Sequence, residues 1–192
     1  MRPLTVGGEA WFGRFSRSQA DYLFKGSLPA THYLARHQVP EIRAYLSMRL
    51  FDSGMYPCLD LIEIALGVFL PEEVVAHQAI QTLRELCVAC VAFTNDLFSY
   101  EKERVTIGNP INLVHCLMTH RGLPLREAVA ETVALTEACV AEFQLQQHRL
   151  PQWGPALDPH VAGYVQGMWH WMRGSLDWSR QTGRYRTPAL CA

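Results

Sequence analysis

The sequence has no long run of apolar residues and no marked excess of charge of one sign. No window of its 192 residues approaches the ~18 uncharged apolar residues that a membrane-spanning helix needs, and residues 1–8 lack the apolar core of a signal peptide. The net charge is −1 at pH 7, so no general attraction to nucleic acids or acidic membranes is expected. We therefore expect a cytoplasmic protein with no membrane span and no nucleic-acid partner.

The cysteines also lack the spacing of a disulfide framework. All six are scattered through apolar stretches of helical pattern, and the one Cys-x-x-Cys, from Cys87 to Cys90, has no second pair to complete a zinc site. Small thiols buried in a core are the better interpretation.

What the sequence does contain is helical periodicity. With 49% hydrophobic and 18% charged residues, a chain of this length has the composition of one domain, which buries about 70% of the surface of the unfolded chain. A loose N-terminal segment precedes the first clear helix. Short loops rich in Gly and Pro separate the later ones, which predicts an all-α, antiparallel helical bundle. The expected helices cover about residues 39–50, 58–67, 80–104, 111–119, 125–150 and 159–178.

Three oxygen-bearing side chains follow the apolar stretch from Leu83 to Phe93. Asn95, Ser99 and Glu103 are spaced at i, i+4 and i+8, so a helix places them on one face, a turn apart. The solvated face of an amphipathic helix has the same pattern. However, an amide, a hydroxyl and a carboxylate also form a hard oxygen set that suits Mg²⁺ sharing its shell with substrate phosphates.

The stretch beginning Asn95-Asp96-Leu97 and ending at Glu103 resembles the second metal-binding motif of class I terpene synthases, (N/D)D(L/I/V)x(S/T)xxxE. Two further features agree with this resemblance. Arg184-Tyr185 is similar to the family's terminal Arg-Tyr pair, which binds diphosphate. Arg49, which lies 46 residues before Asn95, stands where the family has its diphosphate-sensing arginine, ahead of a helix break.

The resemblance implies a role for each matched residue. Asn95, Ser99 and Glu103 would hold Mg²⁺, and the diphosphate of a prenyl substrate would be bound by Arg49, Lys102, Arg184 and Tyr185. At the helix break, Asp52 and Ser53 fall at the family's linker and effector positions, although Ser53-Gly54 can equally be an ordinary helix end. Trp178 is a candidate cavity aromatic, because aromatic faces stabilise carbocations; large aromatics at such positions more often belong to a core.

One family feature is missing. Class I synthases also have an aspartate-rich motif on an earlier helix, yet the only acids before Arg49 are the isolated Glu9, Asp21 and Glu41. The resemblance therefore implies that residues 1–192 form one partial domain, the C-terminal half or a little more of the family bundle without its N-terminal helices. We expect self-association or a missing N-terminal segment to cover the apolar surface left open.

Two functions remain open from the sequence. The first is a Mg²⁺-dependent terpene cyclase acting on a prenyl diphosphate, with farnesyl diphosphate as the default substrate. The second is a catalytically silent, all-α remnant that binds diphosphate or a partner protein.

Overall fold

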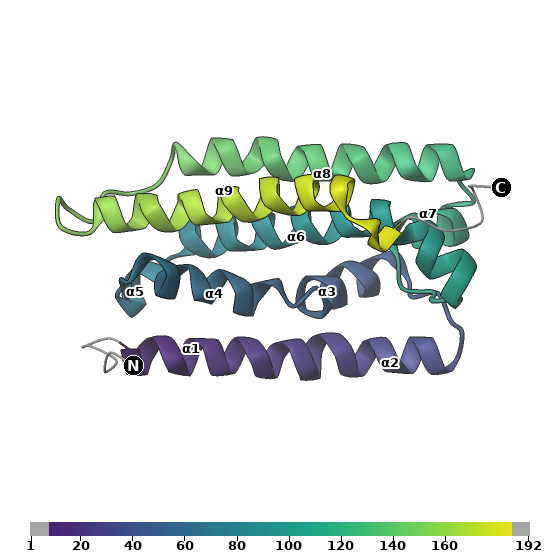
Figure 1. Ribbon diagram of the computed structural model, residues 1–192, viewed down its shortest axis with the longest axis horizontal. Helices are drawn as coiled ribbons and strands as arrows, with labels where there is room; N and C mark the ends of the chain where they lie inside the picture. The colour runs from purple at the N-terminus through teal and green to yellow at the C-terminus, as the bar shows by residue number, and fades with distance from the viewer. Residues whose placement is uncertain (1–7, 186–192) are drawn as a thin grey trace.

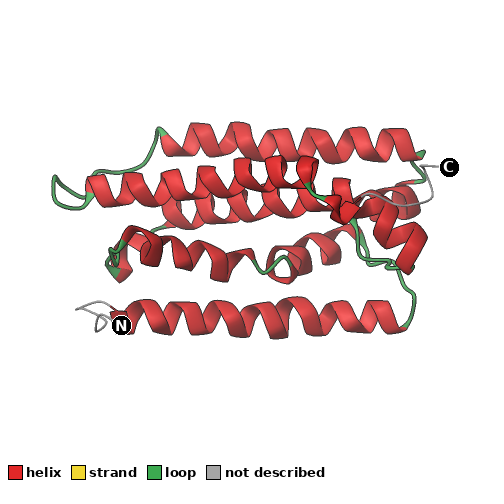
Figure 2. Cartoon of the chain, viewed as in Figure 1, coloured by secondary structure: helices red, strands yellow, loops and turns green. Residues whose placement is uncertain are grey.

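The computed structural model describes residues 8–185, apart from the side chains of Val105 and Thr106, and all regular structure in this range is helical (Figure 2). The prediction of an all-α fold is confirmed. The α-helices are α1 (Gly8–Asp21), α2 (Leu28–Ala35), α3 (Ile42–Asp52), α4 (Met55–Leu66), α5 (Glu72–Val75), α6 (Gln78–Glu101), α7 (Leu113–Arg121), α8 (Leu125–Gln147) and α9 (Asp158–Gln181). Two π-helical stretches, η1 (Tyr22–Ser27) and η2 (Lys102–Ile107), and a 3₁₀ turn, η3 (Gly183–Tyr185), complete them.

Helix α6 is the centre of the bundle. It packs against α8 and α9 along much of its length and also contacts α3, α4 and α7. In Figure 1, α8 lies along the top, α9 crosses in front of α6, and α3 and α4 follow one another below. The segment α1–η1–α2 forms one long rod along the bottom. None of the helices in the described part of the chain is both long and apolar enough to cross a membrane.

The expectation of a loose N-terminal segment is wrong, because residues 8–35 are helical throughout. Trp11 and Arg14 are buried on the inner side of the rod, while Phe12 and Phe24 are 57% and 68% exposed. Large apolar side chains therefore occur on both sides of this rod.

The break between α3 and α4 is a tight structure. Gly54 has φ 67°, a left-handed conformation that other residues rarely adopt. From the opposite side, η1 presses against the end of α3, where a Cβ built on Gly26 would lie 2.4 Å from the backbone nitrogen of Asp52. The end of α3 is thus fixed both by its own turn and by contact with η1.

Two apolar clusters fill the bundle. The first joins α4, the first half of α6 and α9, and includes Cys87 and Cys90; the second joins α3, the second half of α6 and α7, and includes Cys116. Burial raises the pKa of the thiols of Cys90 and Cys116 to about 12. Cys87, Cys90 and Cys116 are thus core residues, as the sequence indicates, whereas Cys58 and Cys139 are half-buried and Cys191 lies outside the described residues.

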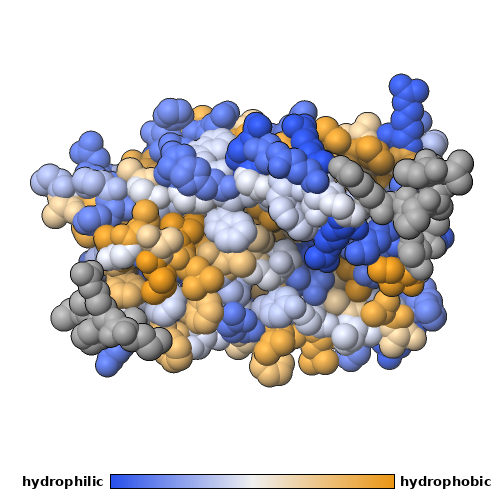
Figure 3. All heavy atoms as spheres, in the orientation of Figure 1, coloured by the Kyte–Doolittle hydropathy of each residue, from blue (hydrophilic) through white to orange (hydrophobic). Residues whose placement is uncertain are grey.

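The apolar stretch of α6 is already covered within this chain, contrary to the expectation that it would leave one face open. From Leu83 to Phe93, only Glu85 is exposed and only Leu86 is half-buried. The exposed large apolar side chains lie on the surrounding helices instead. On the face in Figure 3, hydrophobic surface gathers over α4. Exposed large apolar side chains include Leu61, Ile64 and Leu66 on α4, and Trp171 and Trp178 on α9.

Candidate functional site

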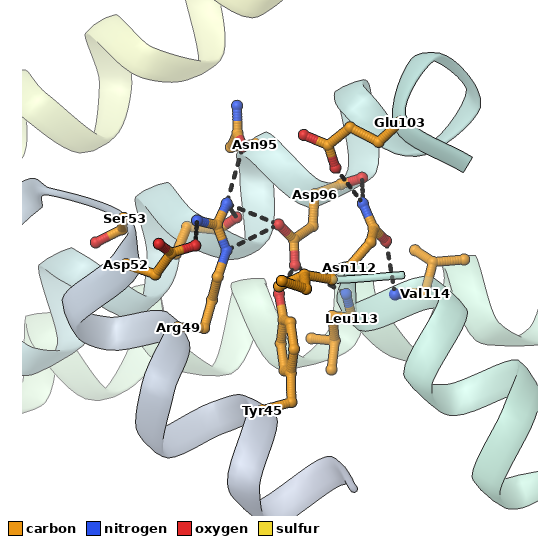
Figure 4. A network of polar contacts seen from close by, with 12 residues as sticks. Tyr45, Arg49, Asp52, Ser53, Asn95, Asp96, Glu103, Asn112, Leu113 and Val114 are labelled. Atoms are coloured by element: carbon orange, nitrogen blue, oxygen red, sulfur yellow. Dashed lines mark hydrogen bonds and ion pairs between the residues drawn. The ribbon is translucent and has the colours of Figure 1, made fainter. Parts of the chain in front are cut away.

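A buried ion pair joins α3 to α6 at the centre of the candidate site (Figure 4). The guanidinium of Arg49 donates to Asp96 Oδ1 through Nε at 3.0 Å and through Nη2 at 2.8 Å. Asp96 has no exposed surface and Arg49 is only 9% exposed. A buried charge pair of this kind needs further hydrogen bonds to offset its loss of hydration.

Those further bonds come from α3 and α7. The hydroxyl of Tyr45 and the backbone N–H of Leu113 both donate to Asp96 Oδ2, the latter at 2.9 Å. Burial and the Asp96 charge raise the pKa of Tyr45, so its hydroxyl stays protonated and remains a donor. Asp96 is therefore fully used inside the protein, with its carboxylate turned away from the side of α6 that carries Asn95 and Glu103.

The amide of Asn95 connects three parts of the fold. Its Oδ1 accepts from Arg49 Nη2 at 2.8 Å, and its Nδ2 donates to the Tyr185 hydroxyl at 2.7 Å. Helix α3, the metal-motif helix α6 and the terminal turn η3 thus meet at this one side chain. The predicted residues Arg49, Asn95 and Tyr185 lie together.

The other two residues of the triad have unused oxygens. Ser99 Oγ is buried and has no hydrogen-bond partner among the described residues. Glu103 Oε2 accepts from Asn112 at 3.3 Å, and within hydrogen-bond distance Oε1 has no donor among the described residues, although the Ser99 hydroxyl lies close enough to favour the carboxylate. Burial raises the pKa of the Glu103 carboxyl, and the nearby Asp96 charge raises it further.

These donors fit one hard cation. An orphaned hydroxyl, a carboxylate with one free oxygen and an amide oxygen with a second lone pair are suitable partners for Mg²⁺, which takes its remaining ligands from water or phosphate. The described residues contain no group of three His, Cys, Asp or Glu side chains able to hold a metal. Glu103 is therefore the one acidic ligand of the triad.

The remaining predicted residues lie around this centre. Asp52 Oδ2 is 3.8 Å from Arg49 Nη1. Ser53 Oγ donates to the Leu50 carbonyl and accepts from the N–H of Met55, so its hydroxyl bridges the helix break. Lys102 is half-buried at the start of η2, beside Glu103.

The C-terminal residues approach the site through Tyr185. The guanidinium of Arg184 is exposed and lies 6.0 Å from the Tyr185 ring centroid. Trp178 is half exposed and packs edge-on against the same ring, 5.9 Å away. The isolated acids are engaged or exposed elsewhere: Asp21 pairs with Lys25, Glu41 with His120, and Glu9 is exposed on α1.

Sequence reasoning missed the residues that support the site. Tyr45 and Asn112 lie outside the motif, and the inward direction of Asp96 was not predicted. The inward direction of Asp96 could have been predicted from the sequence. Successive residues of a helix are about 100° apart, so if Asn95 faces the cleft, Asp96 faces the core.

A groove of about 1110 Å³ lies on another side of α6 from the triad. It runs between α6, α8 and α9, and its α9 wall includes Met172, Leu176 and Arg180. Trp171 and Trp178 lie on the opposite face of α9, given the helical advance per residue. Trp178 is therefore not a wall of this groove.

An all-helical bundle that joins a buried arginine, an Asn/Ser/Glu motif and a terminal tyrosine is typical of a class I terpene synthase domain. Comparison with known families agrees: residues 2–142 match terpene synthase family 2, C-terminal metal binding. The chain belongs to this family. The matched range contains Arg49 and the triad and ends before Trp178, Arg184 and Tyr185.

Curated relatives and solved structures extend the comparison. Alpha-muurolene synthase of Coprinopsis cinerea is 41% identical over 147 residues, which are 77% of this chain and 34% of that protein. Sesquiterpene synthase Agr1 of Cyclocybe aegerita is 36% identical over 165 residues, 86% of this chain and 47% of that protein. A crystal structure of 2-methylisoborneol synthase from Streptomyces coelicolor A3(2), in complex with Mg²⁺ and geranyl-S-thiolodiphosphate, superposes with a TM-score of 0.82 at 25% identity, covering 92% of this chain and 55% of that one. The chain thus spans between a third and a half of these curated relatives.

Proposed function

We propose that this chain is the diphosphate-binding part of a sesquiterpene cyclase, a carbon–oxygen lyase that ionises a prenyl diphosphate with the help of Mg²⁺. The observation that carries the proposal is the convergence of Arg49, Asn95 and Tyr185, with Ser99 and Glu103 presenting unused oxygens beside them. The similarity to alpha-muurolene synthase and to sesquiterpene synthase Agr1 supports farnesyl diphosphate as the substrate.

Each residue has a task that follows from its contacts. Asp96 and Asn95 engage the Nε and Nη2 groups of Arg49, which leaves Nη1 as the donor for a phosphate oxygen. Arg184 and Tyr185 add donors from the other side, and Lys102 adds a positive charge. Bound at Asn95, Ser99 and Glu103, Mg²⁺ would act as a Lewis acid that neutralises the leaving diphosphate.

The donor set also limits what the chain does alone. A diphosphate with several metal ions needs more carboxylates than Glu103, and Glu9, Asp21 and Glu41 lie away from the triad or are paired. We infer that the whole activity requires additional helices supplied by a longer chain or by a partner. The purified 192-residue chain is not expected to be a soluble monomer with cyclase activity.

Calorimetry with inorganic diphosphate, with and without Mg²⁺, tests the binding site. We expect binding that requires Mg²⁺ and weakens in Glu103→Gln, because one formal charge leaves the coordination shell. Glu101→Gln is the matched control, since Glu101 is an exposed carboxylate at the end of α6, two residues before Glu103. Equal binding with and without the metal would leave only an arginine cluster and would contradict the proposal.

The role of Arg49 has its own test. Arg49→Lys should weaken diphosphate binding, since a single ammonium cannot keep the bidentate contact with Asp96 and also reach a phosphate. Undiminished binding by this variant would remove Arg49 from the site.

A catalytically silent remnant is the second candidate, favoured by the lack of an acidic metal cluster among residues 8–185. Light scattering combined with incubation with farnesyl diphosphate and Mg²⁺ tests what this chain does alone. A monodisperse monomer that releases a cyclic hydrocarbon would establish a complete cyclase and exclude the remnant. Mg²⁺-dependent binding without product is expected for this chain alone under both candidates.

A further inference from the structure

Asn112 is a buried side chain that contacts the metal motif without belonging to it. It has no exposed surface and stands as the N-cap of α7. Its Nδ2 donates to the backbone carbonyl of Asp96 at 2.9 Å and to Glu103 Oε2 at 3.3 Å, while its Oδ1 accepts from the N–H of Val114 at 3.0 Å (Figure 4). One amide therefore ties η2 to both α6 and α7.

The orientation of this amide is determined by its partners. Val114 N–H is a donor, so it must face Oδ1; the Asp96 carbonyl and the Glu103 carboxylate are acceptors, so they must face Nδ2. A flipped amide would set donor against donor and acceptor against acceptor. The capping bond of α7 thus fixes the direction of the N–H groups that reach Glu103.

A neutral donor such as the Asn112 amide can hold the Glu103 carboxylate without competing with a metal ion for it. Glu103 is half-buried, close to the Asp96 charge, and lies on the π-helical stretch η2 rather than on the regular helix of Asn95 and Ser99. A cationic partner would compete with a metal for the carboxylate. An amide N–H instead holds Oε2, leaves Oε1 free and adds no charge.

We propose that Asn112 is a positioning residue that presents the Glu103 carboxylate to Mg²⁺; this rests on the proposed function of the triad. The role separates into two halves of one side chain. Oδ1 caps α7, which serves stability, and Nδ2 orients Glu103, which serves metal binding.

Asn112→Ser separates these halves. A serine hydroxyl still accepts from the Val114 N–H as an N-cap but is too short to reach Glu103. Asn109→Ser is the matched control: Asn109 caps the same loop through Oδ1 to the N–H of Ile111 at 3.0 Å, and its side chain makes no hydrogen bond to Glu103. The measurement is the Mg²⁺ concentration that half-saturates binding of inorganic diphosphate, with thermal melting in parallel.

We expect Asn112→Ser to require roughly 10- to 100-fold more Mg²⁺, the usual loss when the hydrogen-bond partner of a metal ligand is removed. Its melting midpoint should lie somewhat below that of Asn109→Ser, because the buried bond to the Asp96 carbonyl is lost as well. In a Glu103→Gln background the same change should cause no further loss, because the two residues act as a unit. If Asn112→Ser does not fold, Asn112→Thr takes its place, since a threonine hydroxyl also accepts as an N-cap and is likewise too short to reach Glu103.

Three results would overturn the positioning role. One is wild-type Mg²⁺ affinity in Asn112→Ser, and another is an equal loss with and without Glu103. In both cases the proposed function stands and only the role of Asn112 fails. If the unmodified chain shows no Mg²⁺-dependent diphosphate binding at all, the proposed function fails and the positioning role fails with it.

Discussion

Replacing Asp96 by asparagine keeps the shape of the side chain and removes the carboxylate that, among the described residues, is the only one to hydrogen-bond Arg49. The nearest remaining carboxylate is Asp52, whose oxygen is 3.8 Å from Nη1. Removing one partner of a buried ion pair leaves the other charge uncompensated and costs about 3–5 kcal/mol. The new amide also turns a donor toward Arg49 or the Leu113 N–H, both donors themselves. Against a typical stability of about 5–15 kcal/mol, this is a large fraction.

Urea unfolding followed by circular dichroism measures the loss. With a slope of about 2 kcal/mol per molar urea, a cost of about 4 kcal/mol lowers the midpoint by roughly 2 M. Asp52→Asn is the matched control; its carboxylate is 22% exposed and more distant, so its cost should stay below about 1 kcal/mol. The double change Arg49→Met with Asp96→Leu should recover much of the loss, because it leaves no buried charge. Equal midpoints for Asp96→Asn and Asp52→Asn would refute the reasoning.

Two further predictions concern stability. Gly26→Ala should cost about 2 kcal/mol and lower the melting temperature by roughly 4–8 °C, because its Cβ meets the backbone of Asp52; Gly174→Ala, with open space in α9, should instead gain about 0.5–1 kcal/mol. Equal melting temperatures for the two variants would contradict the close approach. Burial raises the pKa of Glu63 from 4.5 to about 7, although its ion pair with Arg14 acts against this. The folded protein therefore holds this proton more tightly than the unfolded chain, and the contribution of Glu63 to stability declines as pH rises from about 4.5 to about 7. Melting temperatures of wild type and Glu63→Gln across this range check the effect: the variant should show a flatter profile, and parallel profiles would contradict it.

Helical periodicity predicts most of the fold, since apolar spacing and glycine breaks are local properties of the chain. The break at Gly54 and the ends of α4 and η2, at Gly67 and Gly108, each have the left-handed glycine that the sequence indicates. The helical rod before residue 36 is the exception. In this rod the aromatic residues Phe12 and Phe24 are exposed, so apolar residues do not identify the buried face. The π-helical stretch η1 also changes the spacing at which buried residues recur.

The motif predicts which oxygens gather on one face, while the contacts between distant segments lie beyond such reasoning. Arg49 and Asp96 are 47 residues apart, and Asn95 and Tyr185 are 90 apart. Nothing in local spacing says that a tyrosine on α3 and the N-cap of α7 would meet the same aspartate. Those partners depend on how whole helices cross, which the packing of apolar side chains decides.

The buried thiols provide a natural reporter of folding. A thiol with a pKa near 12 is almost entirely protonated at pH 8, and only the thiolate reacts readily with an alkylating reagent. Cys87 and Cys90 belong to the cluster around α4 and α9, whereas Cys116 belongs to the cluster beside α3 and α7. Mass spectrometry of timed alkylation would therefore record separately when each half of the bundle opens, without any label being introduced into the protein.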